Sequence, residues 1–356
     1  MRRIQYFCTC TFCFCALLVV GGCSSNPALI GGTTPPVTNP PATPTPPTPP
    51  PPSSVTGSSV YVMGGTNGSS VLVFPQTASG PTNVSLEIQG GQVSLDGAGN
   101  VYVLAGSSIN EYSANSLNGS PIRSLAVGPG TAVSAVQDAM ASSTGEIFVS
   151  DSNGVAVFSP TATGSASPLR YILGPPQSTG GTTSVFIPGL ITVDGSDNLY
   201  VQNEYDRTIE VFGPTDTGNV VPERTISGPL TRVSGSGNYI TGMSTDTIGN
   251  LYVLCLCMMG TDGTGGYEFG VFEFAPPANG NVAPTRFVTA PSMYPYFFND
   301  GVSVSADGTI YVSAGTTQGI PTVFEFSSSL SGTVTPSNTV TLDGWTDAEP
   351  SRIAVH

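Results

Sequence analysis

Short runs of β-branched and aromatic residues recur from residue 57 to residue 356, separated by clusters of Gly, Pro, Asn and Asp. Runs of this kind are typical of β-strands, and no long stretch places apolar residues at the spacing of a helix. The pattern therefore predicts an all-β fold with many tight turns.

One signature recurs six times, an aromatic residue between two apolar residues. Its aromatic positions are Tyr61, Tyr102, Phe148, Tyr200, Tyr252 and Tyr311. A second apolar strand that ends in an aromatic residue follows each copy, and then a Pro two residues before Arg or Asn. Most copies are preceded by a further strand and a turn, such as residues 96–100, whose Asp, Gly and Asn suit a tight hairpin. Four strands per copy make one propeller blade, so six copies predict a six-bladed β-propeller.

The last residues of the chain predict how the ring closes. Residues 352–356 match the first strand of a repeat, and the first repeat, which begins near Ser58, lacks that strand. We therefore expect the C-terminal strand to complete blade one beside the channel.

These marks resemble those of NHL-repeat and related six-bladed propellers over residues 57–356. The apolar strand, the Asp-x-x-Gly-Asn turn at 96–100 and the Leu-Tyr-Val strand at 199–201 carry the resemblance. The NHL pattern continues with Ala-Asp and Asn-Arg pairs, which only residues 203–207 approach, so the match is to a divergent branch. The resemblance implies the fold and leaves the activity open, because this architecture hosts lyases, lactonases, receptors and scaffolds.

The N-terminal region has the features of an export signal. Two Arg, an apolar stretch at 4–20 and a Gly pair lead to Cys23. Residues 20–23, Val-Gly-Gly-Cys, resemble the lipobox of bacterial lipoproteins. The resemblance implies that residues 1–22 are removed, that Cys23 is lipidated and anchors the chain in the membrane, and that Ser24 favours delivery to the outer membrane, on its periplasmic side or at the cell surface. The alternative is an ordinary signal peptide in which Cys23 has no role.

Residues 24–56 contain twelve Pro, with Thr and Ser between them. This composition favours extended polyproline II and disorder over a packed core, and it predicts a stalk from the lipidated Cys23 to the propeller. The domain organisation expected is thus a signal peptide at 1–22, a lipid-anchored linker at 23–56 and a propeller at 57–356. A proline-recognition ligand is the alternative role for the stalk.

Charge restricts the partners of the chain. After Cys23 there are seven Arg, no Lys and 23 acidic residues, a formal charge of −16. Nucleic acid needs clustered basic residues, so we expect no nucleic-acid partner. We expect a monomer whose propeller binds a protein or a glycan.

The connections between blades and the hairpins between the second and third strands of each blade share one face of a propeller, where function usually resides. The segment 291–300 contributes Tyr294, Tyr296, Phe297 and Phe298 to this face. Exposed aromatic rings could stack on a sugar or a peptide. The alternative is that they cover the seam between blades five and six.

The position before each inner strand should form a ring at one channel mouth. Its six members are Gln92, Asp138, Leu190, Gly242, Gly301 and Arg352. Acids near the channel axis could hold Ca²⁺ through oxygen ligands, and Asp138 and Asp300 with Asn299 are the candidates. Gluconolactonase-like propellers use carboxylates and Asn around a central divalent ion, but their pattern is not recovered in this sequence. Arg352 is a candidate for ligand contact.

Other reactive residues are few. His356 is the only histidine, which disfavours a His-dependent triad or zinc site. Cys255 and Cys257 alternate along a predicted strand, so they are expected as buried apolar residues or as a local disulfide. The function expected is a cell-envelope lipoprotein that displays a binding or scaffolding propeller. The alternatives are a metal-assisted lactonase or lyase and a carbohydrate-binding surface protein.

Overall fold

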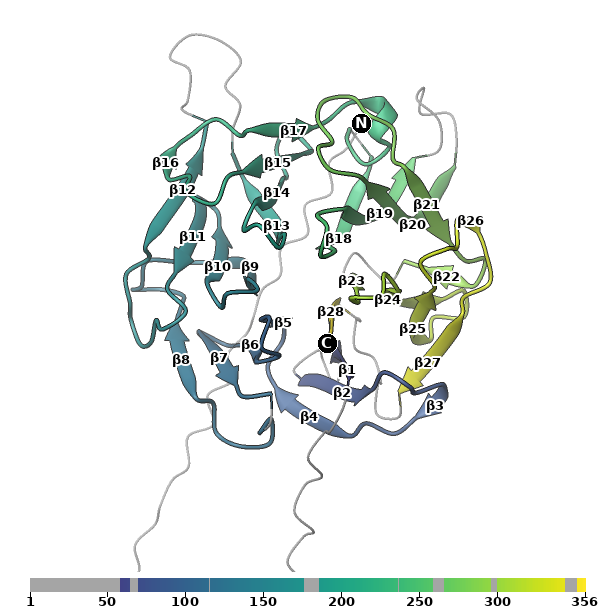
Figure 1. The fold of residues 1–356 in the computed structure, drawn as a ribbon, viewed down its shortest axis with the longest axis horizontal. Coiled ribbons are helices and arrows are strands. Elements are labelled where there is room, and N and C mark those ends of the chain that lie inside the picture. The colour runs from purple at the N-terminus through teal and green to yellow at the C-terminus, as the bar shows by residue number, and fades with distance from the viewer. Residues whose placement is uncertain are drawn as a thin grey trace, which may run out of the picture. The chain divides into compact units, whose positions relative to one another are not determined.

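The computed structural model describes residues 58–64, 70–114, 116–175, 186–235, 237–258, 266–295, 300–342 and 351–356. These residues form six antiparallel sheets arranged as a ring around a central channel (Figure 1). The prediction of an all-β, six-bladed propeller with four-stranded blades is therefore confirmed. Within the described ranges, helical structure is limited to one 3₁₀ turn, η2 (Pro229–Thr231).

The first three blades have the following strands, in order from the channel outward. Blade one contains β28 (Ser351–Val355), β1 (Ser59–Gly64), β2 (Ser70–Pro75) and β4 (Leu86–Gln89). Blade two contains β5 (Val93–Leu95), β6 (Val101–Ala105), β7 (Ser108–Tyr112) and β8 (Arg123–Ala126). Blade three contains β9 (Val136–Ala141), β10 (Ile147–Asp151), β11 (Gly154–Phe158) and β12 (Arg170–Gly174).

The other three blades follow the same order. Blade four contains β13 (Pro188–Val193), β14 (Leu199–Asn203), β15 (Thr208–Phe212) and β17 (Arg224–Ile226). Blade five contains β18 (Tyr239–Thr245), β19 (Leu251–Met258), β20 (Tyr267–Phe274) and β21 (Arg286–Thr289). Blade six contains β23 (Gly301–Val304), β24 (Ile310–Thr316), β25 (Pro321–Phe326) and β27 (Asn338–Leu342), and β22 (Met293–Tyr294) pairs with the end of β24.

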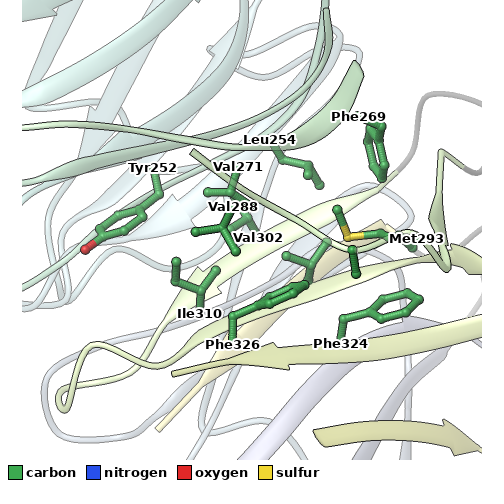
Figure 2. Close-up of a cluster of buried hydrophobic side chains, with 13 residues drawn as sticks. Tyr252, Leu254, Phe269, Val271, Val288, Met293, Val302, Ile310, Phe324 and Phe326 are labelled. Atoms are coloured by element: carbon green, nitrogen blue, oxygen red, sulfur yellow. The ribbon is translucent and has the colours of Figure 1, made fainter. Parts of the chain in front are cut away.

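The core lies between neighbouring blades, so each blade has both faces covered. Strand β10, for example, is buried at every position, which explains why the signature strands are continuous apolar runs rather than alternating ones. The cluster between blades five and six joins Tyr252, Leu254 and Phe269 to Ile310 and Phe324, among others (Figure 2). Burial between blades is therefore what the repeated aromatic positions provide.

Strand β28 completes blade one, as the register of the sequence predicted. It pairs antiparallel with β1, and Ile353 lies opposite Val62 while Ala354 lies opposite Tyr61. Ile353 is 6% exposed and belongs to the buried cluster that also contains Val60. The two strands are almost 300 residues apart in sequence, and their pairing closes the ring.

The Pro-x-Arg mark also has a structural role, because its basic residue ties one blade to the next. Arg170, Arg224 and Arg286 each donate to a backbone carbonyl of the following blade, at 3.2–3.4 Å. In blade six, Asn338 does the same to the carbonyl of Ala78 in blade one, at 2.7 Å. Arg224 also lies 5.5 Å from the centre of the Tyr200 ring, within the range of a cation–π contact.

A second tie between blades is a parallel bridge at the rim of the ring. The outermost strand of a blade pairs there with a glycine of the next blade, six residues after the aromatic end of its third strand. These glycines are Gly80, Gly164, Gly218, Gly280 and Gly332, with φ between 57° and 79°. A positive φ favours glycine, so the repeat needs this residue there. The bridges form the short strands β3 (Gly80–Thr82), β16 (Gly218–Asn219) and β26 (Gly332–Thr333).

We expect Ile353→Ala to lower the free energy of unfolding by about 2–5 kcal/mol, because it opens a cavity in the closing strand. Urea unfolding of the full chain, followed by circular dichroism, measures the change. Ile122→Ala is the matched control, since Ile122 is 57% exposed. Its effect should stay within about 0.5 kcal/mol. Equal effects of the two substitutions would contradict the closing role of β28.

Candidate functional site

The six predicted ring positions lie together at one end of the channel, and two of them form an ion pair. Asp138, on β9 of blade three, has a fully buried side chain and pairs with Arg352 on β28 of blade one. The Asp138 carboxylate also accepts hydrogen bonds from the backbone N–H groups of Ala139 and Ile191, each at 2.8 Å. Burial lowers the pKa of the Arg352 guanidinium to about 10, so it remains charged at neutral pH. The pair thus joins two blades that are not neighbours.

Two glycines at the level of this ion pair, Gly242 and Gly301, let neighbouring inner strands approach each other closely. A Cβ on Gly301 would lie 2.9 Å from the backbone nitrogen of Arg352, and a Cβ on Gly242 would lie 3.0 Å from that of Val302. The distance at Gly301 is shorter than real Cβ contacts allow, and the distance at Gly242 is tighter than most of them, so a Cβ at either position would force the neighbouring backbone to move. Asp138, Gly242 and Gly301 are buried, whereas Gln92, Leu190 and Arg352 are partly exposed.

The rest of the channel is a cavity of about 290 Å³. Its walls are the inner strands of all six blades, from Arg352 at one end to exposed residues such as Gly97, Gly195 and His356 at the other. The cavity therefore opens on the face with the turns between first and second strands.

The inner strand of each blade has one edge whose backbone N–H and C=O groups face the channel. Side chains of neighbouring blades form hydrogen bonds with some of these groups. Ser94 accepts from the Ala141 N–H at 2.9 Å, and Thr245 donates to the Val193 carbonyl at 2.8 Å. Such contacts pair backbone groups that would otherwise face the channel. These polar side chains of the channel wall are thus engaged in hydrogen bonds between blades.

A second hollow lies on the opposite face, over the seam between blades five and six. It has a volume of about 450 Å³. Phe269, Ala290 and Met293 line it and are buried, while Tyr267 and Tyr294 line it and are 54% and 57% exposed. Phe269 and Met293 lie at one end of the buried cluster between the two blades (Figure 2). We call this hollow the tyrosine groove.

Two roles were considered for segment 291–300, contact with a ligand and cover of the seam between blades five and six. The residues that line the tyrosine groove distinguish them. Met293 covers the seam, because its side chain packs into the cluster and is 6% exposed. The neighbouring Tyr294 is exposed and can contact a ligand. Tyr296, Phe297 and Phe298 lie outside the described residues. Tyr267 was not predicted as a site residue, although the sequence carried a signal: the signature aromatics Tyr252 and Tyr311 are 59 residues apart, against 41 to 52 for the other neighbouring copies.

The three candidate calcium ligands are placed as follows. Asp138 is engaged by Arg352 and two backbone N–H groups. Asp300 is 1% exposed and precedes β23, and Asn299 lies outside the described residues. Among the described residues, no group of three His, Cys, Asp or Glu side chains could hold a metal ion. The calcium site stays a prediction.

Cys255 and Cys257 are joined by a disulfide within β19, with their Cα atoms 5.4 Å apart. Both side chains are fully buried in the cluster between blades four and five. The disulfide thus lies in the core behind the hairpin that carries Tyr267.

No protein-family model matches the chain, and no curated protein matches it in sequence. The fold is similar to the crystal structure of a protein of unknown function from Bacteroides caccae, with a TM-score of 0.54 and 12% identity over 84% of this chain and 99% of the other. A virginiamycin B lyase from Staphylococcus aureus aligns over 78% of this chain and 87% of its own, with a TM-score of 0.38 and 11% identity. At 12% identity, the likeness to the Bacteroides caccae protein shows the fold alone.

We expect Asp138→Asn to destabilise the protein by about 3–5 kcal/mol, because it leaves the Arg352 cation buried without its partner. The double variant Asp138→Asn, Arg352→Met should recover most of this loss, since it removes both charges. Urea unfolding of the two variants and the parent chain tests the pair. If the double variant is no more stable than Asp138→Asn alone, the ion pair is not what the ring depends on here.

Proposed function

We propose that the protein is an exported bacterial lipoprotein that displays its propeller as a ligand-binding module at the cell envelope. In this proposal residues 1–22 are the signal peptide, Cys23 carries the lipid in the outer membrane, and residues 23–56 are the stalk of an NHL-like propeller at 57–356. The order of charge, apolar stretch, small residues and Cys23 supports the anchor. Among the described residues, no helix is long and apolar enough to cross a membrane.

The tyrosine groove is the observation that carries the binding role. It lies on the face where the blade connections and long hairpins gather, and it combines a buried apolar floor with exposed aromatic side chains. Concave sites with an apolar lining and a few polar groups are typical of ligand binding. The ligand reaches this groove from solvent, on a monomer held away from the membrane by its stalk.

A metal-assisted lactonase or lyase on the same propeller is the competing function. It would need an ion held by Asp138, Asn299 and Asp300. The Asp138 carboxylate is instead paired with the Arg352 cation. This contact favours a structural role for Asp138, and we therefore propose binding rather than catalysis.

We expect Cys23→Ser to abolish lipid attachment. Cells grown with a clickable palmitate analogue should label the parent chain and leave the Cys23→Ser variant unlabelled and in the soluble fraction. Ser25→Ala is the control and should be labelled like the parent. Labelling that survives loss of Cys23 would place the lipid elsewhere, and a parent chain without label would refute the anchor.

A further inference from the structure

We propose that the tyrosine groove binds an uncharged, hexose-based glycan, with sugar rings stacked on Tyr267 and Tyr294. This inference rests on the proposed binding role and names its ligand class. Sugars have apolar faces of C–H groups and edges of hydroxyls. A site for them needs exposed aromatic rings beside hydrogen-bonding groups.

The strand register of blade five brings the aromatic side chains to one face. Tyr239 pairs with Leu256, Leu256 pairs with Phe269, and Tyr267 pairs with Met258, so these side chains share the face of the sheet toward blade six. Tyr239 and Tyr267 are 43% and 54% exposed at the end of this face, while Phe269 is buried beneath them. The extra length of β19 and β20 thus carries aromatic rings beyond the packed part of the ring.

The groove supplies polar partners next to these rings. Glu268 and Thr333 line it together with Thr289. Thr333 is exposed, and its hydroxyl can donate to and accept from sugar hydroxyls. The volume of about 450 Å³ falls within the range of about 300–1,000 Å³ typical of small-molecule sites. The groove can therefore hold a short stretch of glycan, with the chain continuing into solvent.

The hairpin that presents Tyr267 is supported from behind. Arg232 pairs with Glu268 and lies 5.1 Å and 5.6 Å from the centres of the Phe272 and Phe287 rings. Asn238 accepts from the Met258 N–H at 2.8 Å and donates to the carbonyl of Arg232 at 3.0 Å. These contacts fix the end of the hairpin before a ligand arrives, which reduces the ordering cost of binding.

Charge selects among glycans. Glu268 is the one charged residue among the described residues that line the groove, and its carboxylate is paired with Arg232. The chain after Cys23 has a formal charge of −16, which repels uronic-acid and sulfated polymers. An uncharged glycan avoids this repulsion and needs only stacking and hydrogen bonds.

Isothermal titration of the detergent-solubilised full chain with maltohexaose, cellohexaose, chitohexaose and mannohexaose tests the proposal. We expect saturable binding of at least one of these probes. Tyr267→Ala and Tyr294→Ala should each weaken that binding about tenfold, because each removes one stacking surface. Tyr294→Phe keeps the ring and should retain binding. Tyr205→Ala is the matched control, since Tyr205 is 56% exposed on blade four.

Absence of binding to all four probes overturns the inference, as does binding that Tyr267→Ala and Tyr294→Ala leave unchanged. Circular dichroism of each variant shows whether the fold is intact, and both substitutions are at exposed positions. The result is separable from the anchor. If the chain is labelled with palmitate but binds no probe, glycan binding is refuted and the lipid anchor stands. If the chain is unlabelled but binds a probe, the anchor is refuted and glycan binding stands.

Discussion

The ring depends on a single long-range pairing, that of β28 with β1. Without β28, the edge of β1 would face the channel and blade one would lack the side chains that pack into its cluster. The same strand places Arg352 against Asp138 of blade three. Closure of the ring therefore also ties blade one to blade three, which is not its direct neighbour. Burying this pair is costly by itself, but removing one partner would leave the other charge buried and unpaired.

The blades could be predicted from sequence because three marks recur in register, and each mark corresponds to one strand packed between blades. Closure could be predicted because residues 353–355 repeat the pattern of an inner strand. The contact between Asp138 and Arg352 could not. The repeat register puts both at one ring level, but the distance between them depends on the close approach of strands that Gly242 and Gly301 allow. The parallel bridges were not predicted, although a Gly follows the third-strand aromatic by six residues in five repeats.

Symmetry separates structural residues from candidate functional ones. The turn carboxylates illustrate the first group: Asp96, Asp194 and Asp246 each accept a hydrogen bond from the side chain of the Asn four residues later, at 2.7–2.9 Å. A residue that every blade uses in the same way serves the blade. The hairpin of blade five is the longest among the described strands, with eight residues in each of β19 and β20 against seven and six in β24 and β25 of blade six, and it carries Tyr267. Departure from the repeat thus points to the tyrosine groove.

The two hollows of the ring differ in what they offer a ligand. The channel cavity is lined by strand edges whose polar groups are partly used within the ring, and a ligand there would compete with water for those that remain. The tyrosine groove presents aromatic surface that water solvates poorly, over a floor that is already packed. Binding at the groove therefore gains from burial of apolar surface without disturbing the contacts that close the ring.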